Sequence, residues 1–136
     1  MNVIRLLKNK NSVAYLYENS TIRQGLEKMR AHGYTAIPVI TASGEYAGSI
    51  SEGDFLWHIL AVSDSSMKSQ EKYLIKDIIR KDFIPAVRVD VPMQTLLERS
   101  MTQNFIPVTD DRGSFIGIVT RRDIIGWFVD REKNAE

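Results

Sequence analysis

The residues best suited to chemistry are two hydroxyl–carboxylate pairs with the same spacing, Ser51 with Asp54 and Thr120 with Asp123. In a capping box of the form Ser/Thr-x-x-Asp/Glu, the hydroxyl and the carboxylate satisfy free backbone amides at a helix start, and an apolar run follows each pair here. The same groups can face a ligand, because a helix N-terminus with a hydroxyl favours phosphate, and a carboxylate accepts hydrogen bonds from ribose hydroxyls. Capping and ligand binding are compatible, so both interpretations stay open.

The composition excludes most metal, redox and covalent chemistry. The 136 residues include no cysteine, which excludes disulfides, thiolate zinc sites, iron–sulfur clusters and cysteine nucleophiles. The two histidines are too few for a multi-histidine metal centre. The motifs H-E-x-x-H, G-x-S-x-G and G-x-x-x-x-G-K-S/T do not occur. We therefore expect a protein that is not an enzyme, requires no cofactor and has no metal site.

Charge and hydropathy indicate a globular protein without nucleic-acid or membrane partners. The 18 Lys and Arg side chains against 17 Asp and Glu give a net charge of +1, which argues against general nucleic-acid binding. No apolar run approaches the ~18 residues of a membrane span, and the N-terminus lacks the apolar stretch of a signal peptide. We expect a cytoplasmic location.

The two hydroxyl–carboxylate pairs occupy matching places in an internal duplication. The series Ile37-Pro38-Val39, Gly44, Gly48, Ser51, Asp54 returns as Ile106-Pro107-Val108, Gly113, Gly117, Thr120, Asp123, at a constant offset of 69 residues. Upstream, residues 22–27 match residues 93–98 at an offset of 71. The pattern predicts a first repeat with an N-terminal lead-in over 1–62, a polar linker over 63–73 and a second repeat over 74–136.

Local patterns predict the same elements in both copies, in the order strand, helix, strand, strand, helix. The expected strands span 12–17, 36–40 and 46–50 in the first copy and 86–89, 105–109 and 115–119 in the second. The expected helices start near Ile22 and Met93, with Ser20 and Asp90 as candidate N-caps, and at Ser51 and Thr120. Copies this small bury too little surface alone. We expect the α/β (α+β) fold class, with two β-α-β-β-α repeats packed with pseudo-twofold symmetry.

These motifs give the chain a resemblance to a tandem pair of CBS (cystathionine-β-synthase) domains, a Bateman module of the stand-alone regulatory type. The resemblance is carried by Gly33-Tyr34-Thr35-Ala36-Ile37-Pro38-Val39, by Gly48-x-x-Ser51-x-x-Asp54 and by Gly117-x-x-Thr120-x-x-Asp123. It implies a non-catalytic sensor for an adenosine-containing ligand such as AMP, ADP, ATP or S-adenosylmethionine. It also implies an unidentified partner protein that responds to the bound ligand.

The resemblance further implies two ligand sites built across the copies, in which the Asp contacts ribose and the hydroxyl lies near ribose and phosphate. Site A would combine Thr120, Arg121, Arg122 and Asp123 with Val13, Ala14, Tyr34, Thr35, Ala36 and Ile37. Site B would combine Ser51 and Asp54 with Val87, Asn104, Phe105 and Ile106. The two arginines can hold phosphates by charge-assisted hydrogen bonds, whereas Glu52 would repel them. Site A is therefore expected to be the better nucleotide site.

Two alternatives remain beside an adenine-nucleotide sensor. Residues 33–39 and Thr120-Arg121-Arg122 also resemble bacterial stand-alone CBS proteins that bind cyclic di-AMP. If the hydroxyl–carboxylate pairs are helix caps only, the chain is a protein-interaction scaffold without a ligand.

Two segments, 55–60 and 124–129, are apolar nearly all round the expected helix. A surface helix of a small domain needs one apolar stripe, so the additional apolar surface indicates a partner. The sequence predicts a homodimer through these helices, as the resemblance also implies, because a monomer would expose Trp57, Trp127 and Phe128. The alternative is that the two tryptophans complete the monomer core.

Overall fold

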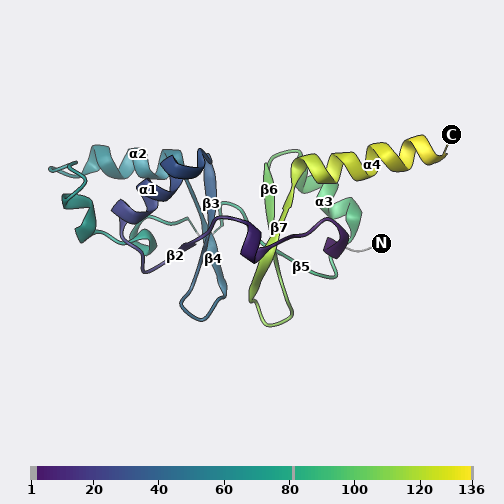
Figure 1. Ribbon diagram of the computed structural model, residues 1–136, viewed down its shortest axis with the longest axis horizontal. Helices are drawn as coiled ribbons and strands as arrows, with labels where there is room; N and C mark the ends of the chain where they lie inside the picture. The colour runs from purple at the N-terminus through teal and green to yellow at the C-terminus, as the bar shows by residue number, and fades with distance from the viewer. Residues whose placement is uncertain (1–2, 81, 136) are drawn as a thin grey trace. The chain divides into compact units, whose positions relative to one another are not determined.

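The computed structural model describes residues 3–80 and 82–135 and contains two compact units (Figure 1). One unit consists of Ala14–Phe83, and the other consists of Met1–Val13 together with Ile84–Glu136. Each unit has its own sheet and two α-helices, which confirms the α+β fold class. The predicted limits at residues 1 and 136 lie outside the described residues.

The unit Ala14–Phe83 has a three-stranded sheet in the order β2-β3-β4. β2 (Leu16–Tyr17) is parallel to β3 (Ala36–Ile40), and β4 (Tyr46–Ser51) is antiparallel to β3. Helix α1 (Ile22–His32) connects the parallel strands, and α2 (Glu52–Ala61) follows β4 directly. The buried core of this unit consists of Leu16, Ile22, Met29, Ile37, Val39, Ile50, Phe55 and Ile75.

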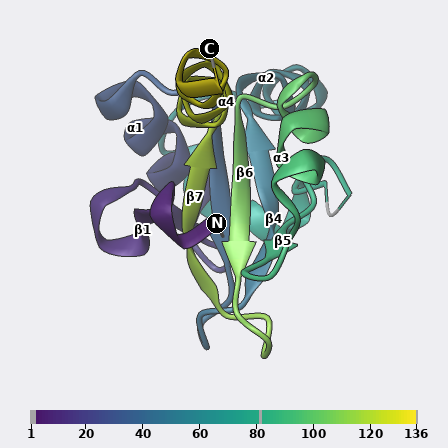
Figure 2. The same cartoon turned by 90° about the vertical axis from the view of Figure 1, so that its right-hand side faces the viewer.

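The other unit repeats this plan with one additional strand, in the order β1-β7-β6-β5 (Figure 2). β5 (Val87–Arg88) is parallel to β6 (Phe105–Thr109), and β7 (Phe115–Thr120) is antiparallel to β6. Helix α3 (Met93–Ser100) connects β5 with β6, and α4 (Arg121–Ala135) follows β7 directly. The buried core here consists of Val3, Val87, Leu96, Ile106, Val108, Val119 and Ile124.

The N-terminal segment belongs to the sheet of the second copy. β1 (Lys8–Asn9) pairs antiparallel with β7, so that Lys8 lies opposite Ile118. The preceding 3-10 helix η1 (Val3–Arg5) buries Val3 completely in the core of the same unit. The pairing of β1 and the burial of Val3 together fix the N-terminal segment to this unit.

The segment before the second copy has the same place in the other unit. The 3-10 helix η4 (Ile75–Asp77) buries Ile75 completely, and Arg80 forms an antiparallel bridge opposite Ser49 of β4. Ser49 and Ile118 are separated by the repeat offset of 69 residues. Arg80 and Lys8 therefore stand at equivalent positions of the two units.

The segments that precede the two copies, here called the lead-in segments, each pack in the compact unit of the other copy. The sequence predicts residues 1–13 within the first repeat and residues 74–83 within the second, whereas each segment belongs to the compact unit that contains the other copy. Short segments without strong periodicity do not show which sheet edge they join, because that edge is chosen by tertiary contacts. The limits of the repeats themselves stay a prediction.

Two helices start at other caps than predicted. Helix α1 is capped by Thr21, whose hydroxyl accepts from the Gln24 amide at 3.1 Å while its own amide donates to Gln24 Oε1 at 2.8 Å. Ser20 is one residue too early for this reciprocal box, which needs Gln24 at the third helical position. Helix α3 starts after Pro92, which makes no side-chain cap hydrogen bond, so Asp90 is not its N-cap.

The predicted linker is part of the unit Ala14–Phe83 and is tied to its other residues by specific contacts. It contains the 3-10 helix η3 (Ser69–Lys72), in which Gln70 is fully buried. Gln70 Oε1 lies 2.7 Å from His58 Nε2, and Glu71 forms an ion pair of 2.9 Å with Arg23. The polar composition of the segment therefore reflects specific hydrogen bonds and an ion pair as well as exposure.

Helix α2 exposes a row of apolar side chains, and α4 exposes fewer than predicted. Leu56, Trp57 and Leu60 are 54%, 70% and 66% exposed. Trp127 and Phe128 are half-buried, and their rings meet edge to face with centroids 4.7 Å apart. Phe128 packs against the core of its unit, which satisfies part of its apolar surface. The helices in the described part of the chain are too short or too polar to traverse a bilayer.

Candidate functional site

At the start of α2, Ser51 and Asp54 form a complete capping box. The Ser51 hydroxyl accepts a hydrogen bond from the Asp54 amide at 3.3 Å, and Asp54 Oδ2 accepts one from the Ser51 amide at 2.8 Å. The Ser51 hydroxyl also lies 3.0 Å from Asp54 Oδ2 and donates to it. The capping interpretation of this pair is confirmed.

Arg80 adds a cation to the Ser51–Asp54 pair. Its Nε lies 2.7 Å from Asp54 Oδ1, and its Nη2 lies 3.4 Å from Asp54 Oδ2 and 3.3 Å from the Ser51 hydroxyl. The Asp54 side chain is 9% exposed, so the carboxylate end of this ion pair is largely shielded from water. The sequence motifs did not predict this partner, which follows Asp54 by 26 residues.

The equivalent pair at the start of α4 is only half closed. The Asp123 amide donates to Thr120 Oγ1 at 3.2 Å, which caps the helix. Within the ranges that the structure describes, the Asp123 carboxylate accepts no hydrogen bond and forms no ion pair. Asp123 is half-buried, so its oxygens are accessible to a ligand.

The two arginines that follow Thr120 differ in their surroundings. Arg121 Nε donates to the carbonyl of Ser100 at 2.7 Å and to that of Gln103 at 3.2 Å. These bonds hold the Arg121 side chain at the C-terminal end of α3 and satisfy carbonyls there. Arg122 is exposed and lines a pocket. Of the two arginines, Arg122 is the one available to a ligand in that pocket.

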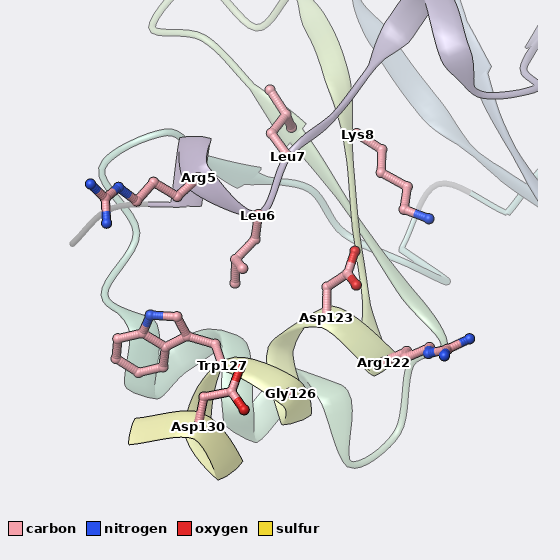
Figure 3. Close-up of a pocket in the computed structure, with 9 residues that line it drawn as sticks. All are labelled: Arg5, Leu6, Leu7, Lys8, Arg122, Asp123, Gly126, Trp127 and Asp130. Carbon is pink, nitrogen blue, oxygen red and sulfur yellow. The ribbon is translucent and has the colours of Figure 1, made fainter. Parts of the chain in front are cut away.

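The pocket beside Asp123 has a volume of about 590 Å³ and lies entirely within one compact unit (Figure 3). It is lined by Arg5, Leu6, Leu7, Lys8, Arg122, Asp123, Gly126, Trp127 and Asp130. Figure 3 shows the Asp123 carboxylate directed from the first turn of α4 toward the segment that carries Leu7 and Lys8. Leu6 extends from that segment toward α4. The pocket combines cations, carboxylates and an apolar wall.

Sequence reasoning missed the N-terminal side of this pocket. Predicted site A contains Arg122 and Asp123 but none of residues 5–8. A signal was present, because residues 3–8 (Val-Ile-Arg-Leu-Leu-Lys) match residues 75–80 (Ile-Lys-Asp-Ile-Ile-Arg) in apolar pattern at an offset of 72. This alignment makes the lead-in segments part of the duplication and pairs Lys8 with Arg80, as the strand register does.

The remaining residues of both predicted sites are divided between the two compact units. Val13 belongs to the same unit as Thr120–Asp123, whereas Ala14 and residues 34–37 belong to the other unit. Of site B, Ser51 and Asp54 lie in one unit, and Val87, Asn104, Phe105 and Ile106 lie in the other. The grouping of each site therefore stays a prediction.

Several of these residues have structural roles within their own unit. The side chains of Ile37 and Ile106 are fully buried in the cores, so they are not accessible to a ligand. Tyr34 is exposed, and its ring stacks on that of His32 with centroids 5.5 Å apart. The side chains of Val87 and Phe105 are also buried.

Backbone hydrogen bonds tie each helix start to the neighbouring strand in the same way. The Thr35 carbonyl accepts from the Glu52 amide at 3.0 Å, and the Asn104 carbonyl accepts from the Arg121 amide at 2.8 Å. Thr35 and Asn104 are separated by the repeat offset of 69 residues. They therefore position the hydroxyl–carboxylate motifs of their own units.

A second cavity, of about 550 Å³, lies in the unit Ala14–Phe83. Its described lining residues are Glu18, Thr41, Tyr46, Ala47, Lys76, Asp77 and Ile79, and none belongs to a predicted site. Burial raises the pKa of the Tyr46 phenol above its ordinary value, although a hydrogen bond with Ser49 opposes this shift. The hydroxyl is therefore protonated at neutral pH.

Comparison with known proteins gives a family match in both copies. The family model described as CBS domain matches residues 5–61 and 75–130. The chain is also similar to the cyclic di-AMP receptor B of Bacillus subtilis, with 24% identity over 115 residues, or 85% of this chain and 78% of the relative. It spans half or less of the length of other curated relatives, namely 48%, 20% and 50% of three from Methanopyrus kandleri and Methanocaldococcus jannaschii.

Solved structures share the fold over nearly the whole chain. CbpB of Listeria monocytogenes, in complex with c-di-AMP, has a TM-score of 0.82 and 22% identity, covering 98% of both chains. CBSX2, in complex with AMP, has a TM-score of 0.75 and 17% identity, covering 96% of this chain and 98% of that chain. At these identities the likeness establishes the fold.

Proposed function

The chain belongs to the CBS-domain family, and we propose that it is a non-catalytic regulatory module that binds an adenine nucleotide of the AMP, ADP or ATP type. The ribose binds Asp123, and the phosphate binds the start of α4 and the neighbouring cations. The occupied module changes how the chain engages an unidentified partner protein in the cytoplasm.

One observation carries this proposal, namely that the Asp123 carboxylate has unused acceptor oxygens beside a pocket. A carboxylate has about four acceptor positions, and a ribose offers two adjacent hydroxyl donors. The start of α4 next to that carboxylate supplies a positive potential for a phosphate, although the Arg121 and Asp123 amides already donate within the chain. We therefore expect Asp123 to bind the ribose and the start of α4 to bind the phosphate attached to that ribose.

The composition of the pocket supports a nucleotide over a simple anion. Leu6 and Trp127 provide apolar surface for a base, and Arg5, Lys8 and Arg122 provide positive charge for phosphate. The volume of about 590 Å³ falls within the ~300–1,000 Å³ of ordinary small-molecule sites. An inorganic phosphate would use only the polar side of such a pocket.

Titration calorimetry with AMP tests the assignment. Asp123→Ala should weaken AMP binding by about 1.5–3 kcal/mol, or roughly ten- to hundredfold, because the hydrogen bonds from ribose to a charged acceptor are lost. Asp111→Ala, which removes an exposed carboxylate in the turn between β6 and β7, is the matched control and should bind AMP as the wild type does. Equal affinity of Asp123→Ala and wild type would contradict the assignment.

Cyclic di-AMP is the second candidate ligand. It is favoured by the similarity to the cyclic di-AMP receptor B of Bacillus subtilis and to CbpB, which was solved with c-di-AMP. Its two phosphates would meet Arg122 together with Arg5 and Lys8, since Arg121 is bonded to carbonyls at the end of α3. Competition decides between the ligands: AMP that displaces cyclic di-AMP at equal concentration would rule out this candidate.

We also propose that the chain forms a homodimer through α2 with a contribution from α4. The proposal is supported by the exposed apolar side chains Leu56, Trp57 and Leu60 on α2 and Ile125 and Val129 on α4. A second copy presents the same apolar surface, so a twofold contact covers both at once. Trp127 contributes less than predicted, because it is half-buried beside Phe128 and lines the pocket.

A further inference from the structure

We propose that Arg80 closes the Ser51–Asp54 motif to a ribose, so that each chain binds one nucleotide, at Asp123, although the sequence contains two such motifs. The inference rests on the proposed function and deepens it by naming the residue that determines how many of the two motifs bind a nucleotide. It concerns contacts within the unit Ala14–Phe83.

Both carboxylate oxygens of Asp54 are engaged within the chain. Oδ1 accepts from Arg80 Nε at 2.7 Å. Oδ2 accepts from the Ser51 amide at 2.8 Å, from the Ser51 hydroxyl at 3.0 Å and from Arg80 Nη2 at 3.4 Å. Three donors thus fill Oδ2, and Arg80 takes one of the two acceptor positions of Oδ1. Two adjacent ribose hydroxyls need two acceptor positions, so they would have to displace Arg80 from Asp54.

The Ser51 hydroxyl is also saturated. It donates to Asp54 Oδ2 and accepts from the Asp54 amide at 3.3 Å and from Arg80 Nη2 at 3.3 Å. A serine hydroxyl has one proton to donate and two lone pairs, and all three are engaged. Both groups that the family resemblance assigns to a ligand are therefore satisfied by the chain itself.

Two contacts besides the Ser51–Asp54 pair hold Arg80 in this place. Its backbone forms a bridge with Ser49 on β4, and its guanidinium carbon lies 3.8 Å from the centre of the Phe83 ring. Arginine stacks on aromatic faces in this way because its planar cation is weakly hydrated. Removal of Arg80 by a ligand would also leave the Asp54 carboxylate, only 9% exposed, without its counter-charge.

The equivalent position of the other unit has no such closure. Lys8 lies opposite Ile118 as Arg80 lies opposite Ser49, but in the described ranges no ion pair joins Lys8 to Asp123. Figure 3 shows the Lys8 side chain passing to one side of the Asp123 carboxylate. The two copies therefore carry the same motif, with its carboxylate occupied in one and available in the other.

Calorimetry with AMP on the full chain measures the stoichiometry that this inference predicts. The wild type should bind one AMP per chain, and Arg80→Ala should bind two, because Asp54 and Ser51 regain free positions. In the Arg80→Ala background, Asp54→Ala should return the stoichiometry to one AMP per chain. Asp123→Ala in the same background should also give one AMP per chain, bound at the newly opened Ser51–Asp54 site. Arg80→Gln, which keeps most of the side-chain volume, should also bind two and serves if Arg80→Ala does not fold.

Arg23→Ala is the matched control, because it removes another half-exposed arginine ion pair from the same unit without touching Ser51 or Asp54. It should bind one AMP per chain. Two AMP per wild-type chain, or one AMP per chain in both Arg80 variants, would overturn the closure while leaving the proposed function intact. A loss of AMP from the Arg80 variants would show that Arg80 holds the nucleotide and would likewise overturn it. Absence of AMP binding in the wild type and in every variant would overturn the proposed function as well.

Discussion

Asp54 and Asp123 illustrate how the surroundings of one residue decide its role. Both follow a helix-capping hydroxyl by three residues, and both amides bond to that hydroxyl. Asp54 completes its capping box and pairs with Arg80, whereas the Asp123 carboxylate has no such partner in the described ranges. Arginine offers a planar fork of donors that matches a carboxylate, and lysine offers a single mobile ammonium. The exchange of Arg80 for Lys8 between the copies accounts for the difference.

Lys8→Arg tests whether the residue type at position 8 decides if Asp123 is available to a ligand. Because Lys8 has the strand register of Arg80, we expect its guanidinium to reach Asp123 and compete with the ribose. AMP affinity should fall roughly tenfold, about 1.4 kcal/mol, which is within the range for a hydrogen bond to a charged group. Titration calorimetry measures the change.

The sign of this change is diagnostic, since Lys8→Arg keeps the positive charge. If phosphate attraction alone decided the affinity, arginine would bind AMP as well as lysine or better. Tighter binding of AMP by Lys8→Arg would therefore contradict the closure mechanism. Lys133→Arg, at the C-terminal end of α4, is the control and should leave the affinity unchanged.

The sequence predicts the local half of the candidate site and misses its distant partners. Ser51 with Asp54 and Thr120 with Asp123 are recognisable because capping is a matter of spacing along the chain. Arg80, Leu6 and Trp127 come from other segments, and a motif read within one copy contains no information on them. Arg121 has partners that the motif likewise does not show, because its Nε donates to the carbonyls of Ser100 and Gln103.

Among the secondary-structure elements, β4 and β7 each have a glycine where a lead-in segment passes close to the strand. Gly117 on β7 has φ +155°, and a Cβ there would overlap the Lys8 carbonyl oxygen of β1. Gly48 on β4 has φ +149°, with the Arg80 carbonyl oxygen 3.3 Å from a Cβ position. Each lead-in segment therefore approaches its strand at a glycine, where no side chain stands between the two backbones.

Gly117→Ala should detach the N-terminal segment from β7. We expect a loss of about 2 kcal/mol or more in the free energy of unfolding, because the substitution combines an unfavourable φ with a backbone overlap. Thermal melting measures the loss, and AMP affinity should fall as well because residues 5–8 leave the pocket.

Gly126→Ala is the matched control for that substitution. Gly126 lies inside α4, and apart from its chain neighbours and the nearby helix backbone no atom lies within 4 Å of its Cβ position. Alanine there should raise stability by up to ~1 kcal/mol through helix propensity. If Gly117→Ala had the same melting temperature as the wild type, β1 would not need this close approach to β7.

Element order is predicted well because periodicity and turn residues are local signals. The strands β3 and β6 have their predicted bounds, and β4 and β7 end one residue later than predicted. The first strand of each copy is much shorter than predicted, as β2 retains only Leu16–Tyr17. The exchange of lead-ins is missed, because the choice of sheet edge depends on burying Val3 and Ile75 in particular cores.

In the whole molecule, the proposed homodimer depends chiefly on α2. Leu56, Trp57 and Leu60 are each more than half exposed, and Trp57 reaches 70%. Burial of a large apolar side chain contributes roughly 1.5–3 kcal/mol, and a twofold contact buries each of them twice. The sum must exceed the entropy cost of association, which is of the order of 4–15 kcal/mol. The proposed dimer therefore requires that the three side chains of both copies be buried together.

Trp57→Glu should dissociate the predicted dimer. The substitution removes the most exposed tryptophan and places two carboxylates in the contact, one from each copy. Sedimentation velocity at micromolar concentration should show a dimer for the wild type and a monomer for the variant. Met101→Glu removes an apolar side chain that is 80% exposed outside α2 and α4, so it should remain dimeric. A wild-type chain that sediments as a monomer across this range would contradict the prediction, and the apolar face of α2 would then belong to the partner protein.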